Sequence, residues 1–210
     1  NHIYRNLVEK GQHPEALIIA CSDSRVDPAI ITQSNPGEFF AIRNIGAIVP
    51  PYDTDNILHG TSSAIEYAVL GLGVKHIVVL GHAQCGGVNA LATGNYKSSD
   101  NDDLDFVQRW LDIGIEAKKK VFDEMKNLDE GEKNRALEQA MIVNSMANLL
   151  SFPWIKERND RQEIQIHGWY FDMPRGMILE YDKEKAAFCD IEKIRKSTGF
   201  LKTKPALEDF

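Results

Sequence analysis

The segment ALIIACSDSRV, Ala16–Val26, begins as an apolar run and ends on a thiol, an acid and a base. Its first part, Ala16–Ala20, has the composition of a buried parallel strand. Cys21, Asp23 and Arg25 then follow at every second position, a spacing that places the three side chains on one face of an extended chain. Such groups are unusual in a core, so we expect a functional site where this strand ends.

Strand patterns alternate with helix patterns along the rest of the chain. Further strands are predicted at Phe39–Ile42, at His76–Leu80, at Glu163–Ile166 leading into Trp169–Phe171, and at Met177–Tyr181, the last two forming a hairpin across Asp172–Gly176. Helices are predicted at Thr61–Leu72, from Val88 onward, at Phe106–Met125 and at Glu132–Leu150. This alternation predicts an α/β fold: a mainly parallel central sheet of four strands plus an antiparallel fifth strand, flanked by helices.

Length and composition favour one globular domain over residues 1–210, without a repeat or a linker. The net charge of −7 disfavours nucleic acid as a partner, and no apolar stretch approaches the length of a membrane span. Three cysteines are too few, and of the wrong parity, for a disulfide scaffold, so we expect a reducing compartment. The cytoplasm is the expected location. Because the chain starts at Asn1, an organelle reached through a removed targeting segment is the alternative.

A second motif, VVLGHAQCGGV at Val78–Val88, ends a strand in the same manner as the first. His82 and Cys85 follow the apolar run, and two glycines then lead into a predicted helix. In open α/β sheets, ligands bind at the carboxyl ends of the strands. The two motifs therefore deliver their polar side chains to the same edge of the sheet.

Cys21, His82 and Cys85 together are a set of ligands that Zn²⁺ prefers, and three protein ligands leave a fourth position open. Asp23 is the obvious fourth ligand that would close the site. Arg25, two residues away, is expected to hold the Asp23 carboxylate in a bidentate pair and to keep it off the metal. The N-terminal dipole of the helix after Cys85 would favour a thiolate there.

Each of these residues alone has an ordinary interpretation. A lone cysteine is usually a small buried hydrophobe, an isolated histidine is usually structural, and an Asp–Arg pair usually lies on the surface. Their grouping at two strand ends makes these separate interpretations less probable than a site. Cys189 has no matching partner and is expected in the core, while His167, at the end of the fourth strand, is the alternative ligand.

The pattern Cys-x-Asp-x-Arg followed by His-x-x-Cys resembles the signature of the β-class carbonic anhydrases. The resemblance extends over most of the chain, in order. It includes the blocks GQHPEALIIACSDSRVDP, NPGEFFAIRNIGAIVPPY, SAIEYAVLGLGVKHIVVLGHAQCGGV, NSMANLLSFPWI and IHGWYFDMPRGMILEYD. Residues 97–135 are less distinctive.

The resemblance implies a zinc lyase that interconverts CO₂ and bicarbonate through zinc-bound hydroxide. It implies one Zn²⁺ per chain on Cys21, His82 and Cys85, with Asp23 and Arg25 as the catalytic orienting pair. It also implies a homodimer or a dimer of dimers. The N-terminal helical arm that such proteins use in dimerisation looks shortened here.

Within that family the chain resembles the open, plant-like type rather than the type that bicarbonate switches off. The open type is marked by Gln12, Phe40, Tyr67 and Gly86, and the tryptophan of the switchable type is missing between Gln12 and Ala20. Gln12 and the backbone of Gly86 are then the implied donors to substrate oxygens. Phe40, Tyr67, Val26 and Ile45 are the implied apolar wall of the substrate pocket.

Two rival functions remain open at this point. One is a zinc-stabilised binding protein in which Asp23 is the fourth ligand and no turnover occurs. The other is hydrolysis of a CO₂ analogue, carbon disulfide or carbonyl sulfide, on the same fold.

Overall fold

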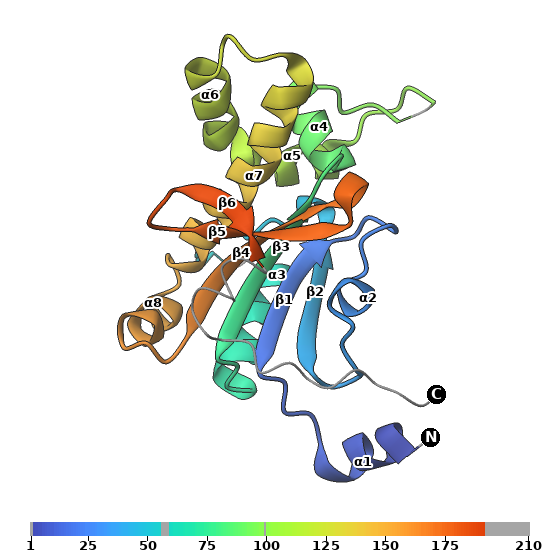
Figure 1. Ribbon diagram of the computed structural model, residues 1–210, viewed down its shortest axis with the longest axis vertical. Coiled ribbons are helices and arrows are strands. Elements are labelled where there is room, and N and C mark those ends of the chain that lie inside the picture. Colours follow the sequence, from blue (N-terminus) through green and yellow to red (C-terminus); the bar gives the residue numbers. More distant parts are fainter. Residues whose placement is uncertain (1, 56–58, 99, 192–210) are drawn as a thin grey trace.

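The computed structural model describes residues 2–55, 59–98 and 100–191, and its centre is a six-stranded sheet (Figure 1). The strands run in the order β2-β1-β3-β4-β5-β6. Neighbours from β2 to β4 are parallel, and β5 and β6 are added antiparallel. The strands are β1 (Ala16–Cys21), β2 (Phe39–Asn44), β3 (His76–His82), β4 (Gln165–Asp172), β5 (Met177–Asp182) and β6 (Ala187–Asp190).

The α/β class, the four parallel strands and the hairpin of β4 and β5 confirm the prediction from sequence. The sixth strand corrects it, because β6 pairs with β5 from Leu179↔Asp190 to Asp182↔Ala187. Its sequence, AFCD, is short and half composed of residues with weak strand propensity. Pairing with β5 therefore decides its conformation, and that pairing leaves little trace in the local sequence.

The helices agree less closely with the predicted ranges. The predicted helix Phe106–Met125 divides around a 3₁₀ turn at Asp112–Gly114, where a β-carbon on Gly114 would lie 2.3 Å from the Met141 side chain. Helices α1, α2 and α8 were not predicted, although Asp27 caps the first turn of α2. The helices are α1 (His2–Lys10), α2 (Pro28–Thr32), α3 (Gly60–Glu66), α4 (Gly86–Thr93), α5 (Asp105–Leu111), α6 (Ile115–Glu124), α7 (Glu130–Leu149) and α8 (Pro153–Asp160), with a π-helical turn at Tyr67–Gly71 after α3.

Both faces of β1 and β3 are apolar, as parallel strands require. Leu17, Ile19, Ile77 and Val79 form the larger core with residues of α3, α7 and α8. The alternate residues of the two strands face the opposite side of the sheet and form a smaller cluster with Ile31 of α2. They are Ile18, Ala20, Val78 and Leu80. This burial on two faces explains why the strands appear in sequence as continuous apolar runs.

Helix α7 lies close against the sheet because two strands carry glycine where it crosses. A β-carbon on Gly81 of β3 would lie 2.6 Å from Ile142, and one on Gly168 of β4 would lie 2.5 Å from Met146. Any larger residue would push the helix away from the strands. The close approach brings α7 to the carboxyl ends of β1 and β3, where the two motifs meet.

Among the residues that the structure describes, no helix is both long and apolar enough to cross a membrane.

Candidate metal centre

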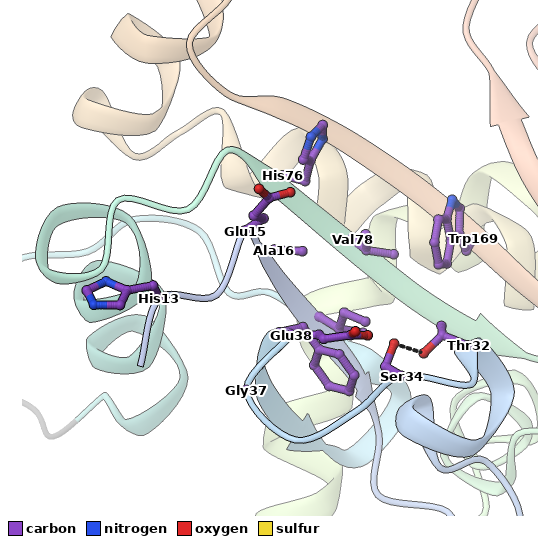
Figure 2. A pocket seen from close by; sticks show the side chains of 12 residues that line it. His13, Glu15, Ala16, Thr32, Ser34, Gly37, Glu38, His76, Val78 and Trp169 are labelled. Carbon is purple, nitrogen blue, oxygen red and sulfur yellow. Dashed lines mark hydrogen bonds between the residues drawn. The ribbon is translucent and has the colours of Figure 1, made fainter. Parts of the chain in front are cut away.

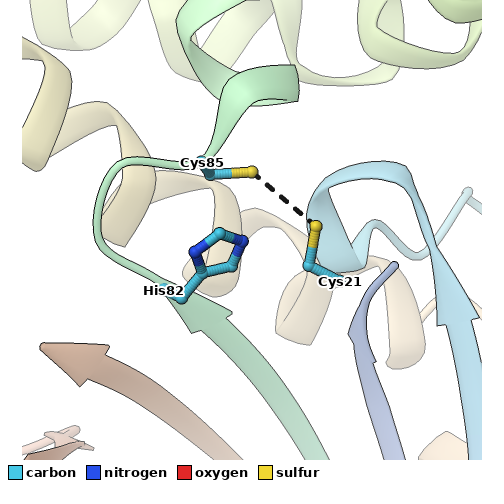
Figure 3. A group of neighbouring side chains, drawn as sticks. All are labelled: Cys21, His82 and Cys85. Atoms are coloured by element: carbon cyan, nitrogen blue, oxygen red, sulfur yellow. Dashed lines mark hydrogen bonds between the residues drawn. The ribbon is translucent and has the colours of Figure 1, made fainter. Parts of the chain in front are cut away.

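The two motifs converge at the carboxyl ends of β1 and β3 (Figure 3). Cys21 is the last residue of β1 and His82 the last of β3, and the two strands are neighbours in the sheet. The chain then turns through Ala83 and Gln84 to Cys85, the N-cap of α4. The Sγ atoms of Cys21 and Cys85 lie 3.9 Å apart, and the ligand atoms of all three residues lie within 4.8 Å of one another.

His82 is oriented for metal binding. Its Nδ1–H donates to the Ala83 carbonyl at 2.9 Å, so the neutral ring carries a lone pair on Nε2. Nε2 is buried and has no hydrogen-bond partner among the residues that the structure describes, in a side chain whose residue is 2% exposed. An unsatisfied buried acceptor is costly, and a cation between it and the two sulfurs would remove that cost. One imidazole and two thiolates suit Zn²⁺, so the residues present fit the ion.

The pKa values of the two cysteine thiols are shifted in opposite directions. The hydrogen bond between them lowers the pKa of Cys21, whereas the same bond, together with burial, raises the pKa of Cys85. Burial lowers the pKa of His82, but Cys21, the Ala83 carbonyl and Asp23 together raise it, and the net shift is upward. Cys21 is therefore the sulfur that ionises first, next to the imidazole of His82.

Asp23 stands beside the cluster without entering it. Its Oδ2 lies 4.0 Å from His82 Nε2, while Arg25 holds both carboxylate oxygens, with Nε to Oδ1 at 2.9 Å and Nη2 to Oδ2 at 2.6 Å. The Arg25 side chain, and then its backbone N–H, lower the pKa of Asp23 well below its usual range. The carboxylate is therefore ionised and fixed in direction.

Cys21, Asp23 and Arg25 come together by a different route from the one their spacing predicts. The strand ends at Cys21, and residues 22–26 turn, with Val26 N–H donating to the Asp23 carbonyl at 3.2 Å. Asp23 and Arg25 meet because of this turn and not because they share a strand face. The spacing singled out residues that lie close together in the structure, but the shared strand face that it implied ends at Cys21.

The turn is held by Arg43 of β2, which the sequence analysis missed. Its guanidinium donates to the carbonyls of Cys21 (3.0 Å), Asp23 (2.7 Å) and Val26 (3.2 Å). An arginine that follows the apolar run Phe39–Ile42 was the available signal. A second missed residue, Glu138 of α7, accepts a hydrogen bond from Cys85 N at 3.2 Å.

Three of the implied pocket residues lie near the cluster. Val26 is buried in the same apolar group as Cys21 and Cys85. Ile45 borders a cavity of about 650 Å³ and lies so close to α4 that a β-carbon on Gly87 would be 2.7 Å from it. Gly86, the first residue of α4, has open space where a β-carbon would point.

The other three lie away from the cluster within one chain. Phe40 and Tyr67 pack together with ring centroids 5.9 Å apart, and Tyr67 is 52% exposed. Phe40 pairs with Leu17 and precedes by four residues the position opposite Cys21, a distance of roughly 13 Å along a strand. Gln12 is exposed before β1.

His167 and Cys189 are also placed outside the cluster. His167 Nδ1 bonds Glu180 Oε1 at 2.8 Å, and its Nε2 lies 3.2 Å from His76 Nδ1, so His167 as an alternative ligand is wrong. Cys189 is a free, half-buried residue of β6 and not a fully buried core residue.

Comparison with known proteins shows the family. The model of the carbonic anhydrase family matches residues 16–178. A carbonic anhydrase of Synechococcus elongatus is 34% identical over 183 residues, which are 86% of this chain. The chain spans 65% of the length of that relative.

Solved structures give the class. The β-carbonic anhydrase CcaA superposes with a TM-score of 0.82 and 35% identity, covering 90% of this chain and 82% of CcaA. A tetrameric β-carbonic anhydrase of Sordaria macrospora superposes with a TM-score of 0.74 and 33% identity, with 85% of each chain covered. Sequence, fold and the Cys–His–Cys cluster lead to one conclusion: the chain belongs to the β-carbonic anhydrase family.

Proposed function

We propose that this protein catalyses the reversible hydration of CO₂ to bicarbonate and a proton. The observation that carries the proposal is the unpartnered Nε2 of His82, enclosed with two cysteine sulfurs beside a carboxylate that Arg25 holds. Cys21, His82 and Cys85 would hold one Zn²⁺ per chain, which when bound would supply a Lewis acid and a water made nucleophilic near neutral pH.

Asp23 is proposed to orient that water. An ionised carboxylate accepts hydrogen bonds and donates none. Arg25 occupies Oδ1 with two donors and Oδ2 with one, which leaves Oδ2, on the side of His82, free to accept one more bond. A water O–H that donates to Oδ2 turns an oxygen lone pair away from the carboxylate and toward CO₂. Because it binds both oxygens, Arg25 would also keep the Asp23 carboxylate from becoming a metal ligand.

The proposed substrate pocket is apolar. Val26 and Ile45 supply apolar surface, which suits CO₂. Gly86 begins α4, where a backbone N–H has no partner within the helix, so it can donate to the oxygens of CO₂ or bicarbonate.

We further propose that the protein is a homodimer or a dimer of dimers of the open type. Gln12, Phe40 and Tyr67 are too far from the cluster to line a pocket with Cys21 in the same chain. If they serve the pocket, a second copy must bring them there. Gln12 and Tyr67 are exposed and Phe40 is half-buried, which leaves this surface available for a second copy. Sedimentation of the active protein tests this, and a fully active monomer would contradict it.

Stopped-flow CO₂ hydration, with zinc measured on the same sample, tests the activity. Turnover that scales with zinc content is the expected result. Zinc at one ion per chain without turnover would instead support the zinc-stabilised binding protein. We propose the cytoplasm as the location, which fractionation of the source cells checks.

A further inference from the structure

Glu138 is a buried carboxylate for which the proposed reaction has no use. It projects from α7, is 4% exposed, and burial raises its pKa. Carboxylates are rarely buried without a function or a partner, because removing a charge from water is costly. Its two oxygens contact different parts of the molecule. Oε1 accepts from Cys85 N at 3.2 Å, and Oε2 accepts from the Tyr170 hydroxyl at 2.7 Å.

The contact with Cys85 involves a peptide group that is held at both of its polar ends. The N–H of Cys85 and the carbonyl of Gln84 belong to the same peptide. The N–H donates to Glu138, while the carbonyl accepts from Arg25 Nη2 at 3.1 Å. The same Nη2 holds Asp23 Oδ2 at 2.6 Å. A continuous path of contacts thus runs from the Asp23 carboxylate through Arg25 and this peptide to Glu138.

The peptide needs to be held, because its backbone is strained. Gln84 has φ of 56°, in the left-handed region that residues other than glycine rarely adopt. Cys85 is an N-cap residue, so its N–H has no partner within α4. Without Glu138 this buried N–H would be unsatisfied, and the turn between the two candidate ligands would lose the contact behind it.

Glu138 is itself fixed from behind. Tyr170 of β4 is fully buried, and burial and then Glu138 raise its pKa, so its hydroxyl stays protonated and donates. The Arg135 guanidinium lies 5.2 Å from the centre of the Tyr170 ring and donates to Asp172 at 2.9 Å. The tight packing of α7 at Gly81 sets its height over the sheet. The carboxylate therefore has little freedom to move away from Cys85.

We propose that Glu138 is a positioning residue that acts through the Gln84–Cys85 peptide, fixing the direction of the Cys85 thiolate and, through Arg25, that of Asp23. The inference rests on the zinc site of the proposed function. It goes beyond that function because it makes a residue of α7, far from the ligands in sequence, responsible for their orientation. The effect is expected on the metal site itself, whether or not the protein hydrates CO₂.

The test compares two substitutions at Glu138 with a stability control. Glu138→Gln keeps an amide oxygen that can accept from Cys85 N and is expected to bind zinc within about threefold of wild type. Glu138→Leu has similar volume but accepts nothing, and it is expected to weaken zinc binding by about 10- to 100-fold, as loss of an outer-shell contact does. Leu149→Val, which trims a buried side chain eleven residues further along the same helix, is the control and should leave zinc affinity unchanged. Affinity is measured by competition with a chelator.

A spectroscopic readout separates positioning from general destabilisation. In the cobalt-substituted protein, the thiolate-to-metal absorption should shift in Glu138→Leu and match wild type in Glu138→Gln and Leu149→Val. Adding Arg25→Lys to Glu138→Leu should cost less than the product of the two single effects on zinc affinity, because both residues act on one peptide. Wild-type affinity and absorption in Glu138→Leu would overturn the proposal.

If Glu138→Leu does not fold, the wild-type protein decides. The Cys85 amide should exchange with solvent slowly, and exchange at the rate of an unprotected amide would overturn the proposal. A wild-type protein that binds zinc tightly but does not hydrate CO₂ would refute the proposed function and leave the positioning role standing. Unchanged zinc affinity in Glu138→Leu would refute the positioning role alone.

Discussion

The two ends of the parallel sheet differ in how closely their candidate functional residues lie together. At the carboxyl ends of β1 and β3, the side chains of Cys21, His82 and Cys85 are buried and converge. At the amino ends, Phe40 and Tyr67 form an aromatic pair, of which Tyr67 is largely exposed. One chain therefore brings the candidate ligands together, whereas the implied pocket residues Phe40 and Tyr67 lie away from those ligands in the same chain.

The amino ends also carry a hollow of about 560 Å³ that is unlike the metal site (Figure 2). Glu15 and His76 lie together at one side of it, and the hydrogen-bonded pair Thr32 and Ser34 lies at another. Its polar groups are spread around a wide opening. At the carboxyl ends, by contrast, the candidate ligand atoms of Cys21, His82 and Cys85 all lie within 4.8 Å of one another. Convergence, rather than cavity size, separates the candidate catalytic end from the other.

The largest effect is expected from removing a sulfur at the carboxyl end. Cys21→Ser and Cys85→Ser should each lose most of their zinc on dialysis and with it CO₂ hydration, because a hydroxyl is a far poorer ligand than a thiolate. Metal analysis and stopped-flow rates on the same samples measure this. Cys189→Ser is the matched control and should keep both, since Cys189 lies on β6 outside the cluster. Full zinc occupancy in both ligand variants would refute the site.

The next effect is expected at the Asp23–Arg25 pair. Asp23→Asn should lower the hydration rate by about 10²-fold or more while zinc stays bound, because an amide can donate to the water that the carboxylate orients. Arg25→Ala should lower it steeply as well, with Asp23 moving to roughly 2.0 Å from the metal in crystals at neutral pH.

The control for this pair is an ordinary surface ion pair. Lys156→Ala removes an exposed contact with Asp160 and should not change the rate. Near-normal turnover in Arg25→Ala, with water at the fourth position, would show that Arg25 is equally ordinary.

A smaller effect is expected at the amino ends of the sheet. Tyr67→Ala removes an aromatic pair with Phe40, and such pairs are worth about 0.5–1.5 kcal/mol. If this pair contributes to the dimer interface, the dissociation constant of the dimer should rise roughly 2- to 10-fold. The variant should then be less active than wild type at low protein concentration and regain that activity at high concentration. Analytical ultracentrifugation and rates over a concentration series measure it. Leu150→Ala, at another exposed apolar residue, is the control, and a rate per chain that is independent of concentration in both variants would break the comparison.

The smallest effect is expected at His76 and concerns stability alone. Burial, and then His167, lower the pKa of His76. The unfolded chain therefore binds a proton at His76 more readily than the folded one, while Glu15 opposes and Lys75 adds to the shift. The stability is present above the ordinary histidine pKa of about 6.5 and is lost as pH falls through the lower folded pKa.

His76→Gln should therefore flatten the fall in stability between about pH 7 and pH 5. Urea unfolding at several pH values measures the free energy of unfolding. His13→Gln, at an exposed histidine beside the same hollow, should keep the wild-type slope. If His76→Gln keeps that slope too, burial of His76 does not contribute to the pH dependence.

Much of the fold was predictable from sequence because its central strands are buried on both faces. Ile18 and Ile19 face opposite sides of the sheet, and both are buried, so the apolar run is unbroken. The failures occur where contacts distant in sequence decide the conformation. The helix over 106–125 divides where Gly114 packs against Met141, and β6 exists because β5 offers an edge.

The sequence by itself determined the candidate ligand set. Parallel strands place their carboxyl ends at one edge, so residues that follow two such strands meet whatever the details of packing. The Asp23–Arg25 pair was predictable because its two members lie only two residues apart in sequence, although a turn and not a shared strand face brings them together.

Only the tertiary structure decided which distant groups support that set and which stay away from it. Glu138 reaches Cys85 across 53 residues of sequence, and Arg43 reaches Cys21 across 22. Both contacts depend on how closely α7 and β2 pack, which no local pattern encodes. The separation of Phe40 and Tyr67 from the metal cluster has the same origin, because strand register and not spacing along the chain sets the distance between the two ends of the sheet.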